Sequence, residues 1–189
     1  MEIAIVLIIV LVVIAATYGG LYNGLVHAGQ KVKEAWSGID VQLKRRYDLI
    51  PNLINTVKGF AAQEQNVLMS VTQARAAAIA VPDGAVTQQA QAENALSGTL
   101  KSIFALSENY PDLKSNQNFL ELQNALSETE DQIAASRRIY NGNVTVLNTK
   151  VQSFPSNIVA GMHKFKEADF FELAETEKEG VQATPQVNF

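Results

Sequence analysis

Apolar residues follow helical spacing along most of the chain. Between residues 22 and 71 they recur in steps of three and four, the pattern of a buried stripe on an amphipathic helix. This stripe comprises Tyr22, Leu25, Val32, Trp36, Ile39, Leu43, Ile50, Leu53, Val57, Phe60, Val67 and Val71. A second stripe has a period of seven, at Phe119, Leu126, Ile133, Tyr140, Leu147 and Phe154. No segment has a convincing strand-like alternation, so the pattern predicts an all-α protein.

Two turn-rich stretches divide the helical pattern. The first is Pro-Asp-Gly at residues 82–84, and the second lies at Tyr110 and Pro111. Ser115 is suited to cap the following helix, because its hydroxyl can accept a free backbone N–H. Pro155 ends or kinks the last helix. The pattern therefore predicts helical segments from residue 22 to about 80, from 87 to 109 and from 116 to 153.

The first part of the chain is almost purely apolar. Residues 3–22, IAIVLIIVLVVIAATYGGLY, carry no charge over about 20 residues, which is the length that crosses a bilayer core of about 30 Å. A cleaved signal peptide would have a basic start and a shorter apolar run, whereas here only Glu2 separates Met1 from the run. The pattern predicts a permanent transmembrane anchor at residues 1–22, rather than a leader or a buried soluble helix.

Flanking charge predicts the orientation of this anchor. Lys31 and Lys33 follow the span, then a basic run at residues 44–46, whereas nothing basic precedes the span except the amino terminus. The positive-inside rule then places the N-terminus outside and the part of the chain that follows the span in the cytoplasm.

Pro51 allows two interpretations of the first helical stretch. Proline is tolerated in a first helical turn, so Asp48 could cap a new helix after the chain folds back at Tyr47 and Asp48. The segments would then form an antiparallel up-down four-helix bundle over residues 23–154, which is the architecture we expect. Alternatively, a single long helix continues with a kink, as the unbroken phase of the stripe suggests. That helix would leave half of its stripe without an intramolecular partner and would require oligomerisation.

Composition narrows the possible functions. The formal charge of −4 argues against a nucleic-acid partner, and the absence of cysteine excludes disulfides and thiolate metal sites. The two histidines, His27 and His163, lack metal-ligand spacing, and no phosphate-binding loop is present. We therefore expect no metal, no cofactor and no catalytic residues.

Charged and amide side chains on or beside the stripes form the candidate site. A buried charge costs several kcal/mol unless it is paired and hydrogen-bonded. We expect these residues to form a polar layer that sets helix register, although each of them could instead reach solvent. They are Arg46, Asn52, Glu64, Glu130, Arg137 and Asn148.

Residues 155–189 form a distinct C-terminal tail, in which aromatic residues precede an acidic run. Phe165, Phe170 and Phe171 are its candidate contacts with the membrane or a protein partner. The alternative is that they simply cap the end of the bundle.

Residues 35–60, AWSGIDVQLKRRYDLIPNLINTVKGF, closely resemble the signature of the LemA family. Residues 22–26 (YNGLV) and residues 108–141, from ENYPDLKSNQNF to SRRIYN, extend the resemblance over nearly the whole chain. One departure is the lack of an arginine near Gly29 and Gln30, where the family often has one. The resemblance implies a bacterial inner-membrane protein with one N-terminal span and a cytoplasmic helical bundle, and it implies no reaction.

These observations favour a membrane-anchored, non-enzymatic scaffold that self-associates. The alternative is an accessory or adaptor subunit of a membrane protease, a transporter or a stress-signalling complex, with an unknown protein partner.

Overall fold

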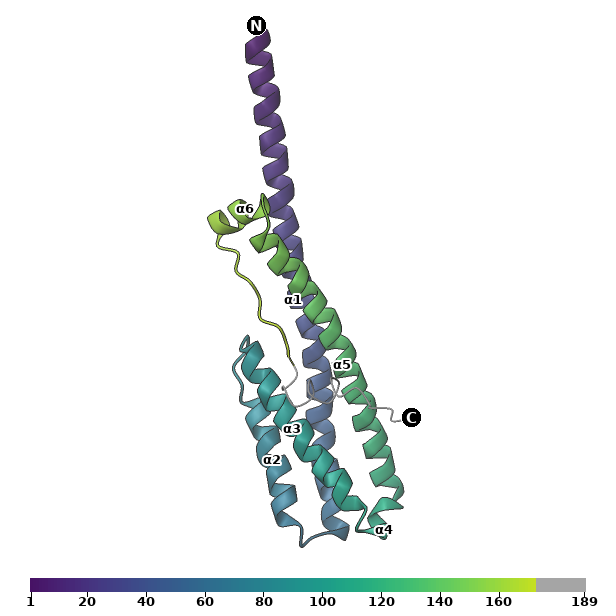
Figure 1. Cartoon of the computed structure of the whole chain (residues 1–189). Helices are drawn as coiled ribbons and strands as arrows, with labels where there is room; N and C mark the ends of the chain where they lie inside the picture. The colour runs from purple at the N-terminus through teal and green to yellow at the C-terminus, as the bar shows by residue number, and fades with distance from the viewer. Residues whose placement is uncertain (173–189) are drawn as a thin grey trace, which may run out of the picture. The chain divides into compact units, whose positions relative to one another are not determined.

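The computed structural model describes residues 1–172 and is all-helical over that range (Figure 1). Its helices are α1 (Glu2–Phe60), α2 (Gln65–Ile79), α3 (Val86–Ser107), α4 (Pro111–Lys114), α5 (Gln117–Gln152) and α6 (Ser156–His163). The chain forms two compact units. Among the described residues, the first comprises Met1–Ile39 and Ser136–Asp169, and the second comprises Asp40–Ala135 together with residues 170–172. Helices α1 and α5 each contribute to both units, so the units cut across the predicted ranges 1–22, 23–154 and 155–189.

Helix α1 is a single helix of 59 residues that contains Pro51 in its interior. The predicted turn at Tyr47 and Asp48 is therefore wrong, and neither Asp48 nor Pro51 starts a new helix. The physical reason lies in the stripe: Ile50, Leu53 and Val57 are fully buried on one side of α1. Burial of three such side chains, at roughly 1.5–3 kcal/mol each, exceeds the roughly 3 kcal/mol that an interior proline costs.

Helix α1 ends instead at Phe60, residues 61–64 connect it to α2, and Glu64 is the N-cap residue of α2. In the second unit, α2, α3 and the first part of α5 pack with residues 40–60 of α1, and consecutive long helices run in alternating directions (Figure 1). The core of this unit draws on all four segments and on α4. It contains Ile50, Leu53, Val57, Ala61, Leu68, Val71, Ala78, Leu96, Leu100, Ile103, Leu113, Phe119 and Leu126.

The first unit joins the start of α1 to the end of α5 and to α6. Leu25 of α1 packs with Val159 and Ala160 of α6 in a small buried cluster. Farther along α1, the ring of Trp36 meets that of Tyr140 edge-on at a centroid distance of 5.4 Å. Apolar side chains of both helices therefore continue the stripes that the sequence predicted.

Helix α1 also contains the candidate membrane span. Within residues 1–172 it is the one helix long and apolar enough to cross a membrane, and none of its most apolar window is buried. The large apolar side chains of residues 3–14 are all exposed, from 47% at Val10 to 78% at Ile3. The protein thus has one N-terminal candidate span, as the sequence predicted.

Candidate functional site

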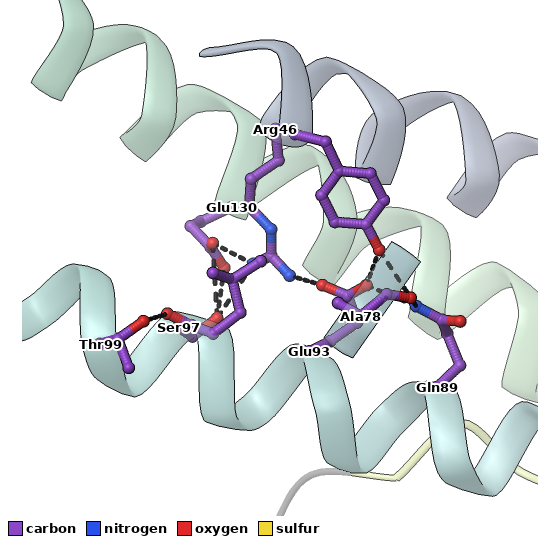
Figure 2. Close-up of polar contacts among 9 residues, drawn as sticks. Arg46, Ala78, Gln89, Glu93, Ser97, Thr99 and Glu130 are labelled. Carbon is purple, nitrogen blue, oxygen red and sulfur yellow. Dashed lines mark hydrogen bonds and ion pairs between the residues drawn. The ribbon is translucent and has the colours of Figure 1, made fainter. Parts of the chain in front are cut away.

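The most buried charged side chain of the second unit is Arg46, which is 1% exposed and lies on the apolar stripe of α1 between Leu43 and Ile50. Its guanidinium bonds Glu93 of α3 and Glu130 of α5, and it donates to the Ser97 hydroxyl at 2.9 Å (Figure 2). A guanidinium presents several donors in a planar fork, which suits it to two carboxylates at once. Arg46 therefore connects three helices through a single side chain.

Glu93 receives donors from three residues. Arg46 and the Tyr47 hydroxyl both donate to it, and the Gln89 amide donates at 2.6 Å. Gln89 lies one turn before Glu93 and also donates to the Tyr47 hydroxyl at 3.1 Å. The Glu93 side chain is only 5% exposed, so these bonds replace the water that the carboxylate loses.

Burial and the two neighbouring carboxylates shift the pKa of Arg46 in opposite directions. Burial lowers the pKa of the guanidinium, but Glu130 and Glu93 outweigh it, so the pKa is raised and the charge is retained. Burial, followed by the hydrogen bond to Glu93, raises the pKa of Tyr47 well above its usual value. Tyr47 is therefore a neutral donor at physiological pH. The Nε of Arg46 is buried and has no hydrogen-bond partner among the described residues.

A second group of polar contacts lies at the connection between α1 and α2. The Tyr110 hydroxyl, just before α4, donates to Glu64 at 2.9 Å and accepts from the Gln63 amide at 2.8 Å. The hydrogen bond to the Glu64 carboxylate raises the pKa of Tyr110. Glu64 does not share the Arg46 network, because the chain has already turned at residues 61–64 and left the register of the α1 stripe.

The six residues of the predicted polar layer do not all share one environment. Arg46 and Glu130 are bonded to each other, Glu64 pairs with Tyr110, and Asn52 is exposed. Arg137 and Asn148 belong to the other unit. There, Asn148 exchanges two hydrogen bonds with the backbone of Ala168, at 2.9 and 3.0 Å, which secures the segment after α6 to α5.

Sequence reasoning missed Glu93, Ser97, Tyr47 and Gln89. Glu93 carried a usable signal, because it stands three residues before Leu96 in a run that continues at Leu100 and Ile103. A carboxylate in phase with buried leucines requires a cation from another helix, and Arg46 occupies the equivalent kind of position on α1. The polar partners Ser97 and Gln89 carried no comparable signal.

The three candidate phenylalanines also differ in their environments. Phe165 is half-buried against the Leu25 cluster and meets the Tyr22 ring edge-on at 6.0 Å. Phe171 is 1% exposed, whereas Phe170 is 39% exposed. The burial of Phe171 agrees with the packing alternative, and a contact of these residues with membrane or partner stays a prediction. The predicted tail continues to residue 189, and its residues 173–189 lie outside the described range.

These features define an all-helical protein with one N-terminal candidate membrane span and a buried charge network that joins three of its helices. The sequence model of the LemA family matches residues 35–189, and the chain belongs to the LemA family.

Similarity to curated proteins extends over most of the chain. It is 28% identical over 169 residues to Protein LemA of Metamycoplasma hominis, a match that covers 88% of this chain and 76% of the relative. It is 25% identical over 175 residues to Magnetosome protein MamQ 2 of Paramagnetospirillum magneticum, covering 80% of this chain. For Magnetosome protein MamQ of Magnetospirillum gryphiswaldense the identity is 21% over 174 residues, covering 79%. The matched region spans 64% of each of these two MamQ proteins.

Proposed function

We propose that this protein is a non-enzymatic scaffold that is anchored in the bacterial inner membrane and self-associates through its helical body. The observation that carries the proposal is the continuity of α1, which runs without a break from a segment of exposed apolar residues to residues of the buried core. An exposed apolar segment of this length requires lipid around it. Membership of the LemA family supports the membrane location.

Flanking charge supports a cytoplasmic body. Lys31, Lys33, Lys44 and Arg45 are exposed on α1, whereas Arg46 is engaged with Glu93 and Glu130. Cationic residues that follow a span favour the cytoplasmic side. The test is protease added to intact spheroplasts: we expect the body to survive and to be digested only after lysis. Digestion of the body in intact spheroplasts would overturn the orientation.

An exposed apolar strip on α5 supports self-association. Ile139 and Val146 are seven residues apart and are 63% and 51% exposed, and Gly142 lies between them with open space around its α-carbon. Apolar residues at i and i+7, with a small residue at i+3, form the seam of a helix pair. The strip lies on the side of α5 away from the buried Tyr140, Val144 and Leu147.

The mass of the purified protein in detergent, measured by light scattering, tests this strip. We expect an oligomer for the natural chain and a monomer of about 20.6 kDa for the Ile139→Glu, Val146→Glu variant. The matched control is Thr145→Glu, Gln152→Glu, which adds the same charge at two exposed positions, also seven apart, on another side of α5. A natural chain that is monomeric throughout would overturn self-association.

The adaptor alternative differs in its crosslinking products. A photocrosslinker at Val146 in native membranes would join two copies of this chain in a self-associating scaffold. A recurrent foreign partner would support an accessory subunit of a membrane complex instead.

A further inference from the structure

Helix α6 has one buried face and one strongly exposed apolar face. Ser156, Val159 and Ala160 are buried, whereas Ile158 and Met162 are 55% and 67% exposed. Phe154, just before the helix, is 80% exposed. Residues 158 and 162 are four apart, the spacing of neighbours on one side of a helix. Ile158 and Met162 therefore form an exposed apolar face on α6, and Phe154 adds a third exposed apolar side chain just before the helix.

This helix packs beside the end of the candidate span (Figure 1). The Tyr18 hydroxyl and Nε2 of His163 are 2.6 Å apart, and the rings of Tyr22 and His163 have centroids 4.7 Å apart. Leu21 and Leu25 of α1 pack against Val159 and Ala160 of α6. Helix α6 is thus held at the level of residues 18–25 of α1.

That level coincides with the boundary of a bilayer. Helix α1 contains no Lys, Arg, Asp or Glu between Glu2 and Lys31, a length of about 42 Å at about 1.5 Å per residue. A hydrocarbon core of about 30 Å takes up about 20 of these residues, which leaves the last part of the uncharged segment at the headgroups. Tyr18 and Tyr22 are of the residue type enriched at this level.

We propose that Phe154, Ile158 and Met162 insert into the boundary between headgroups and acyl chains of the cytoplasmic leaflet, so that α6 lies in the membrane surface beside the span. The inference rests on the proposed membrane anchor and adds a second, interfacial contact with lipid. An amphipathic helix with its apolar side chains on one face binds membranes in this way. The contact between Tyr18 and His163 provides each polar group with a partner away from water.

The charges that follow α6 suit this position. Lys164 and Lys166 are exposed directly after the helix, where anionic headgroups can pair with them. Lys164 adopts a left-handed backbone conformation at φ 58° and ends the helix. Phe165, one of the candidate membrane or partner contacts, packs against Leu25 and Tyr22 of α1. The side chains proposed to meet lipid are therefore the exposed ones, Phe154, Ile158 and Met162.

The absence of cysteine allows a direct measurement of depth. A nitroxide spin label is placed on a single cysteine in the full chain, in vesicles of zwitterionic and anionic phospholipid. The variants are Ile158→Cys and Met162→Cys on the proposed face, Asn157→Cys as the matched control on another exposed side of α6, and Val10→Cys as a marker of the span. Collision with oxygen, which concentrates in lipid, is compared with collision with a water-soluble nickel chelate.

We expect the ratio of oxygen to nickel collisions to be several-fold higher at residues 158 and 162 than at 157, and highest at residue 10. A high ratio at residue 10 with low ratios at 158 and 162 would overturn the interfacial contact and leave the anchor intact. A low ratio at residue 10 would overturn the anchor itself. Low collision rates with both reagents at 158 and 162 would mean that protein covers this face, which also overturns the inference.

Discussion

Arg46 and Glu93 are 47 positions apart in the chain, and their side chains form an ion pair that is 1% and 5% exposed. The pair joins α1 to α3, and Glu130 of α5 bonds the same guanidinium. Both charges of such a pair are removed from water on folding. The attraction between them and their hydrogen bonds offset this desolvation cost only while every partner is present. The network therefore discriminates between the native arrangement of helices and any arrangement that separates these residues.

Removal of Arg46 is expected to destabilise the second unit strongly. The Arg46→Ala variant leaves Glu93 buried without its cation, which costs about 3–5 kcal/mol. The matched control is Arg45→Ala, because Arg45 pairs with Glu128 at 2.9 Å while both side chains are well exposed. That control should lose about 1 kcal/mol or less. Urea unfolding followed by far-ultraviolet circular dichroism measures both, and equal losses would contradict the interpretation.

A double-mutant cycle separates true partners from residues that merely resemble them in sequence. Arg46 and Glu93 are expected to show a coupling energy of about 2 kcal/mol, because each single substitution already breaks the shared bond. Arg46 and Glu64 should show coupling near zero, since Glu64 is bonded to Tyr110 instead. Strong coupling between Arg46 and Glu64 would restore the idea of one polar layer.

The sequence predicted part of this site for a clear physical reason. A charge at Arg46 in an apolar stripe must find a buried partner, and Glu130 beside the second stripe was a suitable one. The same rule applied to Glu93 would have completed the pair. The position of Asn148 could not be predicted this way, because its partners are the backbone atoms of Ala168, and backbone atoms leave no mark in a residue pattern.

The fold shows a similar division. Periodicity identified the helices and the apolar faces, because burial of a stripe is a property of many residues. The end of α1 was misplaced, because Pro51 and Asp48 match the local signals for a helix start, whereas residues 61–64 contain neither glycine nor proline. Burial of Ile50, Leu53 and Val57 decides the outcome, and it depends on α2 and α3 being in place.

Pro51 provides a test of this continuity. Inside a helix, proline removes a backbone hydrogen bond and crowds the preceding turn. The Pro51→Ala variant should therefore be more stable in urea, by about 1–3 kcal/mol. The matched control is Pro111→Ala, because Pro111 stands in the first turn of α4, where proline costs little. A loss of stability in Pro51→Ala would indicate that this residue starts a helix after all.

The buried Tyr140 is expected to make the stability of the first unit depend on alkaline pH. Its hydroxyl donates to the carbonyl of Asp169 at 2.9 Å, and burial, with a smaller effect of the Asp169 carboxylate, raises the pKa of Tyr140 to about 12. An unfolded tyrosine ionises with a pKa of about 10. Between these values the unfolded chain releases a proton that the folded chain keeps, so stability falls as pH rises from about 10 to about 12.

The Tyr140→Phe variant has no ionisable hydroxyl at this position, so its stability should not show this part of the decline with pH. At pH 8 the variant is expected to be less stable by about 1 kcal/mol, because it loses the hydrogen bond to Asp169. Toward pH 12 the natural chain should lose up to about 2–3 kcal/mol relative to the variant, at about 1.4 kcal/mol per pH unit. Urea unfolding at each pH, followed by the fluorescence of Trp36 beside Tyr140, measures the difference. If both proteins declined in parallel above pH 10, ionisation of Tyr140 would not be coupled to folding.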